Sequence, residues 1–182
     1  MSPLTQAMVI NAVVLVAVLE ADLGPHRKIG AFRIVRPLLM AAAIVPLYLT
    51  ALTTHGMGLT LEIAGAAAGL LLGLLGTSLM GVYRSPATGK PASRAGFGYA
   101  ALWTIVIGAR AAFSYGSSHW FRTQLGTWMG THDVSVDAIT NTLILMAIAM
   151  VLTRTIGMAA RARALPAPAA VPASLTPSLS SR

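Results

Sequence analysis

Residues 59–83, LTLEIAGAAAGLLLGLLGTSLMGVY, decide the fold of this chain. As a helix they can cross a bilayer, because a hydrocarbon core of about 30 Å needs roughly 20 residues at a rise of about 1.5 Å each. The glycines are spaced four, four and three residues apart and share one side of that helix: Gly65, Gly69, Gly73 and Gly76. Such a stripe lets a second backbone approach closely, which favours helix association in lipid. We therefore predict that this helix is the packing centre of a bundle.

The composition is typical of a membrane protein. Of 182 residues, 55% are hydrophobic and only 10% are charged, and the mean hydropathy is +0.72. The chain has no cysteine, which excludes disulfides, thiol redox chemistry and cysteine-bound metal. The predicted fold class is all-α, a polytopic membrane helix bundle.

Five apolar segments are expected to span the membrane. Their predicted bounds are residues 4–22, 34–54, 59–83, 97–116 and 136–157. The first has no Lys or Arg before it and no small-residue cleavage site after it, so we interpret it as a retained helix and not as a signal peptide. Together these segments form one domain, residues 1–163. Residues 164–182 are rich in Pro, Ala and Ser and are predicted to be a disordered cytoplasmic tail.

The basic residues predict how the bundle is oriented. Eleven of the 13 Lys and Arg residues fall on one side of the five spans, near residues 27–36, 84–94 and 154–182. Cytoplasmic segments carry this excess, so the amino terminus should be outside and the carboxyl terminus cytoplasmic, in the cell membrane. The same asymmetry explains a pI near 11.2 without a nucleic-acid partner.

Several short motifs resemble a known family. They are a basic loop that runs into a proline-headed span, a glutamate that opens the third span, and arginines in the fourth and last spans: His26-Arg27-Lys28, Arg36-Pro37-Leu38, Glu62, Arg110 and Arg154. Together they resemble the CcdC-like family of small bacterial multi-pass membrane proteins, over most of residues 20–163. The resemblance implies a multi-pass fold and an association with cell-envelope assembly, and it brings no assigned reaction.

Glu62 and Arg110 are the main candidates for chemistry, because ionisable groups within a membrane are costly and face partners or water. Both should lie in the outer half of the bilayer, where they can pair. A structural ion pair is one interpretation. In the other, Glu62 is a catalytic acid and Arg110 holds the polar head of a substrate.

Other polar residues are expected at a similar depth and could line an outward-facing pocket with this pair: Tyr48, His55, Tyr115, Asp137 and Asn141. Asp137 is a third candidate for catalysis, although a negative charge there also suits a helix amino terminus. On the inner side, Glu20 and Asp22 face several cations, for which we expect a structural salt-bridge network: Arg27, Lys28, Arg36, Arg84 and Arg154. No cofactor or metal site is predicted, since His119 and His132 have no third firm ligand.

Three functions remain open at this point. The first is an accessory or assembly protein that packs against a membrane partner, or against its own copies, in the lipid bilayer. The second is a small membrane-embedded enzyme for a lipid-soluble substrate, for example an isoprenoid. The third is a transporter subunit, which five spans without an internal repeat would support only in an oligomer.

Overall fold

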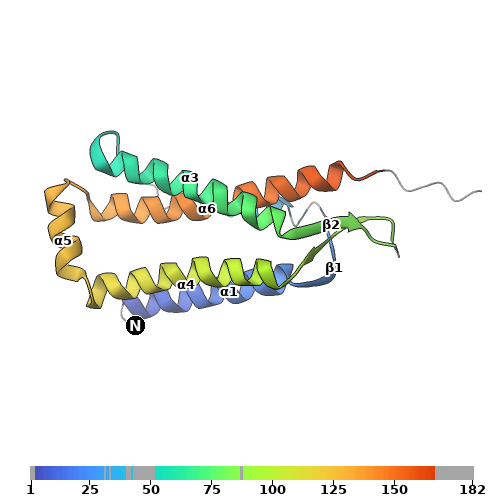
Figure 1. Cartoon of the computed structure of the whole chain (residues 1–182), viewed down its shortest axis with the longest axis horizontal. Helices are drawn as coiled ribbons and strands as arrows, with labels where there is room; N and C mark the ends of the chain where they lie inside the picture. Colours follow the sequence, from blue (N-terminus) through green and yellow to red (C-terminus); the bar gives the residue numbers. More distant parts are fainter. Residues whose placement is uncertain are drawn as a thin grey trace, which may run out of the picture.

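The computed structural model of the protein (Figure 1) describes residues 3–30, 32, 34–39, 42, 52–86 and 88–166. Its elements, in chain order, are α1 (Pro3–Asp22), β1 (Gly24–Lys28), α3 (Gly56–Ser78), β2 (Met80–Arg84), β3 (Pro91–Ala95), α4 (Phe97–His119), α5 (Arg122–Thr131) and α6 (Val136–Arg163). The described chain is mostly helical, as predicted. Within it, α3, α4 and α6 are long and apolar enough to cross a membrane.

The long helices form two pairs that lie side by side (Figure 1). In one pair, α3 packs along α6 in the same direction, since Gly65, Gly69 and Gly73 meet successive turns of α6. In the other pair, α1 and α4 run in opposite directions. A small sheet joins the pairs at one end of the molecule, and α5 lies across the other end. We call these the sheet end and the α5 end.

The sheet corrects the prediction of an all-α fold. Its strand order is β1-β3-β2, with both pairings antiparallel. Part of it occupies residues 80–83, which the sequence analysis assigned to the third span. The helix instead ends at Ser78, and Val82 pairs with Ser93 across the hairpin. A short apolar run suits a strand as well as a helix, so hydropathy alone could not separate the two.

Other bounds also differ from the predicted spans. Helix α4 continues to His119 and α6 to Arg163, while the connection predicted at residues 117–135 contains the helix α5. Helix α1 covers the first predicted span. The second span lies largely outside the described residues, of which 34–39 are helical. Residues 167–182 of the predicted tail also lie outside them.

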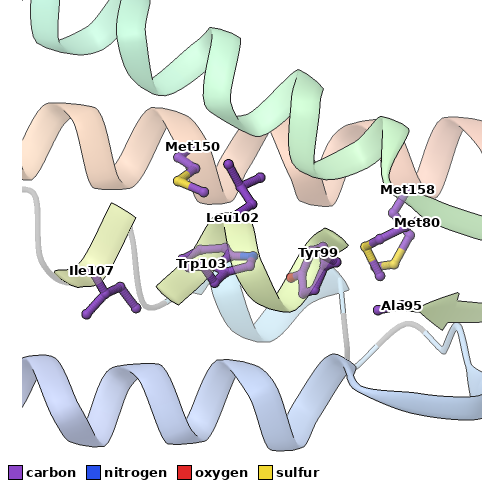
Figure 2. Close-up of a cluster of buried hydrophobic side chains, with 8 residues drawn as sticks. All are labelled: Met80, Ala95, Tyr99, Leu102, Trp103, Ile107, Met150 and Met158. Carbon is purple, nitrogen blue, oxygen red and sulfur yellow. The ribbon is translucent and has the colours of Figure 1, made fainter. Parts of the chain in front are cut away.

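The core lies between the two helix pairs and is richest near the sheet end (Figure 2). It combines aromatic and aliphatic side chains of α4 with two methionines of α6 and two residues of the sheet: Tyr99, Leu102, Trp103, Ile107, Met150, Met158, Met80 and Ala95. Only 28%, 17% and 28% of the most apolar window in α3, α4 and α6 is buried. Soluble monomers rarely expose apolar surface on this scale, so the outer faces of these helices suit lipid or a partner.

Basic segments gather at the sheet end. The hairpin between β2 and β3 and the end of α6 meet there (Figure 1). The Nη1 atom of Arg161 donates to the carbonyl oxygen of Thr77 at 2.7 Å, near the carboxyl end of α3, where a cation complements the helix dipole. Arg84 donates to the carbonyl oxygens of Gly89 at 3.0 Å and of Leu165 at 3.4 Å, which ties the hairpin to the chain beyond α6.

Candidate functional site

Glu62 lies in the second turn of α3 and is buried, with 3% of its surface exposed. Its Oε1 atom accepts three hydrogen bonds. Asn141 Nδ2, on α6, donates at 3.2 Å, while Thr53 donates from Oγ1 at 3.1 Å and from its backbone nitrogen at 3.3 Å. The carboxylate therefore joins α3 to α6 and to the segment that precedes α3.

Arg110 lies elsewhere, in the middle of α4. It lines a cavity of about 140 Å³ between α1, α4 and α6, together with Asn11, Trp103 and Met146. Among the described residues, no hydrogen bond or ion pair joins its guanidinium to Glu62. Along α6, five residues separate Asn141 from Met146, which is about 8 Å at a helical rise of about 1.5 Å per residue. The two candidates are thus at different helix interfaces and at different depths.

The other residues of the predicted outer pocket are only partly brought together. Asn141 is bonded to Glu62, whereas Tyr48 lies outside the described residues. His55 is exposed and bonded to its neighbour Thr54. Tyr115 stacks on His119, one turn further along α4, with ring centroids 4.4 Å apart.

Asp137 is exposed in the first turn of α6. The residue that caps this helix is Ser135, whose side chain accepts from the backbone nitrogen of Ala138 at 3.0 Å. A negative charge in the first turn complements the helix dipole. The position of Asp137 therefore fits an interaction of its charge with the helix dipole better than a place in a pocket.

The four glycines of the predicted stripe, at residues 65, 69, 73 and 76, are all buried. A Cβ atom built on Gly65, Gly69 or Gly73 would lie 2.7, 2.2 or 2.6 Å from a backbone carbonyl oxygen of α6, whereas one built on Gly76 would make an ordinary contact with Leu102 at 3.6 Å. At the first three positions no other residue fits without displacing one of the two backbones.

A buried ionic cluster at the sheet end joins α1, α4 and α6. Arg154 forms an ion pair with Asp22, and the Tyr99 hydroxyl is hydrogen-bonded to both partners. The guanidinium carbon also lies 6.0 Å from the ring centroid of Tyr99 and 5.9 Å from that of Trp103, within cation–π range. The sequence analysis placed Asp22 and Arg154 in an inner salt-bridge network but missed Tyr99, because nothing in its sequence context distinguishes it from an interfacial aromatic residue.

Three polar atoms beside this cluster are buried and have no hydrogen-bond partner among the described residues. They are Arg154 Nε, Thr155 Oγ1 and Trp103 Nε1. Unpaired buried donors are costly, so the apolar packing around the cluster has to offset this cost. In the same described part of the chain, no three His, Asp or Glu side chains are grouped closely enough to hold a metal ion.

Comparison of the chain with protein families, with curated proteins and with solved structures found no match. The interpretation of the site therefore rests on its geometry.

Proposed function

We propose that the protein is a multi-pass integral membrane protein with an accessory role, which binds or assembles partner membrane proteins and catalyses no reaction itself. The proposal includes five spans, with residues 34–54 as the second, and an outside amino terminus in the cell membrane of a bacterium. Support comes from the exposed apolar faces of α3, α4 and α6 and from the gathering of basic segments at one end. A membership of the CcdC-like family, with its link to cell-envelope assembly, would fit this role.

The observation that carries the proposal is that both buried carboxylates are bonded to side chains of other segments. The chain has five acidic residues, all of them among the described residues, and two are buried. Asp22 is paired with Arg154, and Glu62 accepts bonds from Thr53 and Asn141. A general acid has to reach its substrate within hydrogen-bond distance. Both buried carboxylates instead hold helices together, and the other three acidic residues are exposed.

The enzyme hypothesis has one observation in its favour, which is the cavity beside Arg110. With Glu62 as the acid and Arg110 as the anchor, however, one substrate would have to contact both side chains. They lie at different interfaces, and the Oε1 atom of Glu62 already accepts three hydrogen bonds from Thr53 and Asn141. The accessory role therefore has the stronger support.

Complementation of a deletion strain tests the proposal. Glu62→Gln keeps the shape and an acceptor oxygen but cannot give up a proton, and Asp137→Asn does the same at an exposed position. Both variants should fold like the parent and restore the deletion phenotype fully. A Glu62→Gln protein that is present at the parental level, melts at the parental temperature and fails to complement would refute the accessory role in favour of catalysis.

A further inference from the structure

The cavity beside Arg110 has the size of a small ligand. It lies between α1, α4 and α6 and has a volume of about 140 Å³. Three of its lining side chains, Trp103, Ile107 and Met150, are drawn in Figure 2, where they lie between α6 and α1. An engineered apolar cavity of about 150 Å³ binds benzene, so this space suits a body of about six carbon atoms.

The lining is polar at one end and apolar at the other. Arg110 and Asn11 lie toward the α5 end, while Trp103 and Val18 lie toward the sheet end. On α4, seven residues separate Arg110 from Trp103, and on α1 seven residues separate Asn11 from Val18. Each separation is about 10 Å along the helix axis at a rise of about 1.5 Å per residue. Between them the cavity is lined by valine, isoleucine and methionine side chains. A ligand that matches this lining has a polar head and a slender apolar body.

Arg110 determines the charge of that head. Within the described part of the chain its guanidinium forms no hydrogen bond or ion pair, because the buried carboxylates are bonded elsewhere: Asp22 to Arg154, and Glu62 to Asn141. A cation in the middle of a membrane helix is costly unless it is paired. A carboxylate is the complementary group, since a guanidinium binds it through two parallel hydrogen bonds.

We propose that this cavity binds a small lipophilic carboxylate, with the carboxylate on Arg110 and an apolar body of about six carbon atoms against Trp103. The body is either one aromatic ring or a short alkyl chain, because both fill the same volume. Binding neutralises the charge of Arg110 within the bundle. The site is independent of the proposed accessory role, because occupancy requires no reaction and no partner.

Quenching of tryptophan fluorescence by a brominated ligand tests the site. The probes are 4-bromobenzoate for the ring and 6-bromohexanoate for the chain, and 4-bromobenzamide is the uncharged control. Trp103 is buried in the cavity wall, whereas Trp120 and Trp128 lie near the α5 end, so Trp103→Phe separates quenching in the cavity from quenching in the detergent. At least one of the two acids should quench the parent protein saturably, and this quenching should disappear in Trp103→Phe.

Two comparisons test whether Arg110 recognises the carboxylate of the ligand. The bromobenzamide should bind about tenfold more weakly than the acid, because a charge-assisted pair is lost. Arg110→Met should weaken binding of the acid to a similar extent, whereas Arg94→Met, which removes an exposed cation at the sheet end, should leave it unchanged. Saturable quenching by neither acid, or equal binding of acid and amide by the parent protein, overturns the proposal. Equal binding of acid and amide by the parent protein would overturn the proposal even if Arg110→Met fails to fold.

Discussion

Replacing Gly69 by alanine tests the packing of α3 against α6 with the smallest change available. The new Cβ atom would lie 2.2 Å from the carbonyl oxygen of Met146 and 2.9 Å from the Cβ of Ala149. The first of these atoms belongs to a helical backbone and cannot rotate away. Because ordinary contact begins at 3.4 Å, the two helices have to separate by about 1 Å at this turn.

The size of this displacement determines how much Gly69→Ala should lower the free energy of unfolding. Overpacking a core lowers the free energy of unfolding by about 1–3 kcal/mol. Alanine raises it by up to about 1 kcal/mol, because its helix propensity is higher than that of glycine. Because the distance at Gly69 is the shortest of the three, we take the upper part of the first range and expect a net loss of about 1–2 kcal/mol in the free energy of unfolding for Gly69→Ala. Gly108→Ala in α4 is the matched control, because that glycine is exposed and a Cβ atom there meets nothing within 4 Å. The control should be neutral or more stable by up to about 1 kcal/mol.

The measurement is unfolding of both variants in mixed micelles, titrated with a denaturing detergent and followed by circular dichroism. The geometry also predicts an order, with Gly69→Ala the least stable, Gly65→Ala and Gly73→Ala next, and Gly76→Ala close to the parent. If Gly69→Ala unfolds at the same denaturant concentration as Gly108→Ala, the close approach of α3 and α6 does not exist in the folded protein, and the reasoning is refuted.

Two further predictions concern the ionic cluster and the topology. Arg154→Met or Asp22→Asn alone should destabilise the protein by about 3–5 kcal/mol, because each strands a buried partner, whereas the double variant Asp22→Leu/Arg154→Met should cost less than either in the same unfolding assay. A double variant at least as unstable as the worse single variant would contradict this account of the pair. Reporter fusions after His55 and after Lys90 should report outside and cytoplasm respectively, and the reverse pattern would overturn the orientation.

Much of the helical architecture could be predicted because it follows from length and hydropathy. The predicted spans at residues 97–116 and 136–157 fall within α4 and α6. The sheet was missed because Met80 to Tyr83 is apolar enough to continue a helix, and its partner strand Pro91–Ala95 carries no hydrophobic alternation that would identify it.

Only part of the candidate site could be predicted from the sequence. Glu62 and Asn141 were placed at one level of the membrane, and the structure joins them. Arg110 was also placed near that level, but residue spacing fixes only position along a helix axis. Which helix a side chain faces depends on how all the helices pack, and the tight contact of α3 with α6 turns Glu62 toward Asn141.

The pairing of α3 with α6 also has a consequence during synthesis. Helix α3 ends at Ser78, and α6 is complete only at Arg163, 85 residues later. At a translation rate of about 5–20 residues per second, the glycine face of α3 waits for roughly 4–17 s before its partner exists. Until residue 141 is made, 63 residues after Ser78, the carboxylate of Glu62 lacks Asn141, its donor from α6. A chain that stops before α6 leaves the glycine face of α3 and the carboxylate of Glu62 without their contacts from α6.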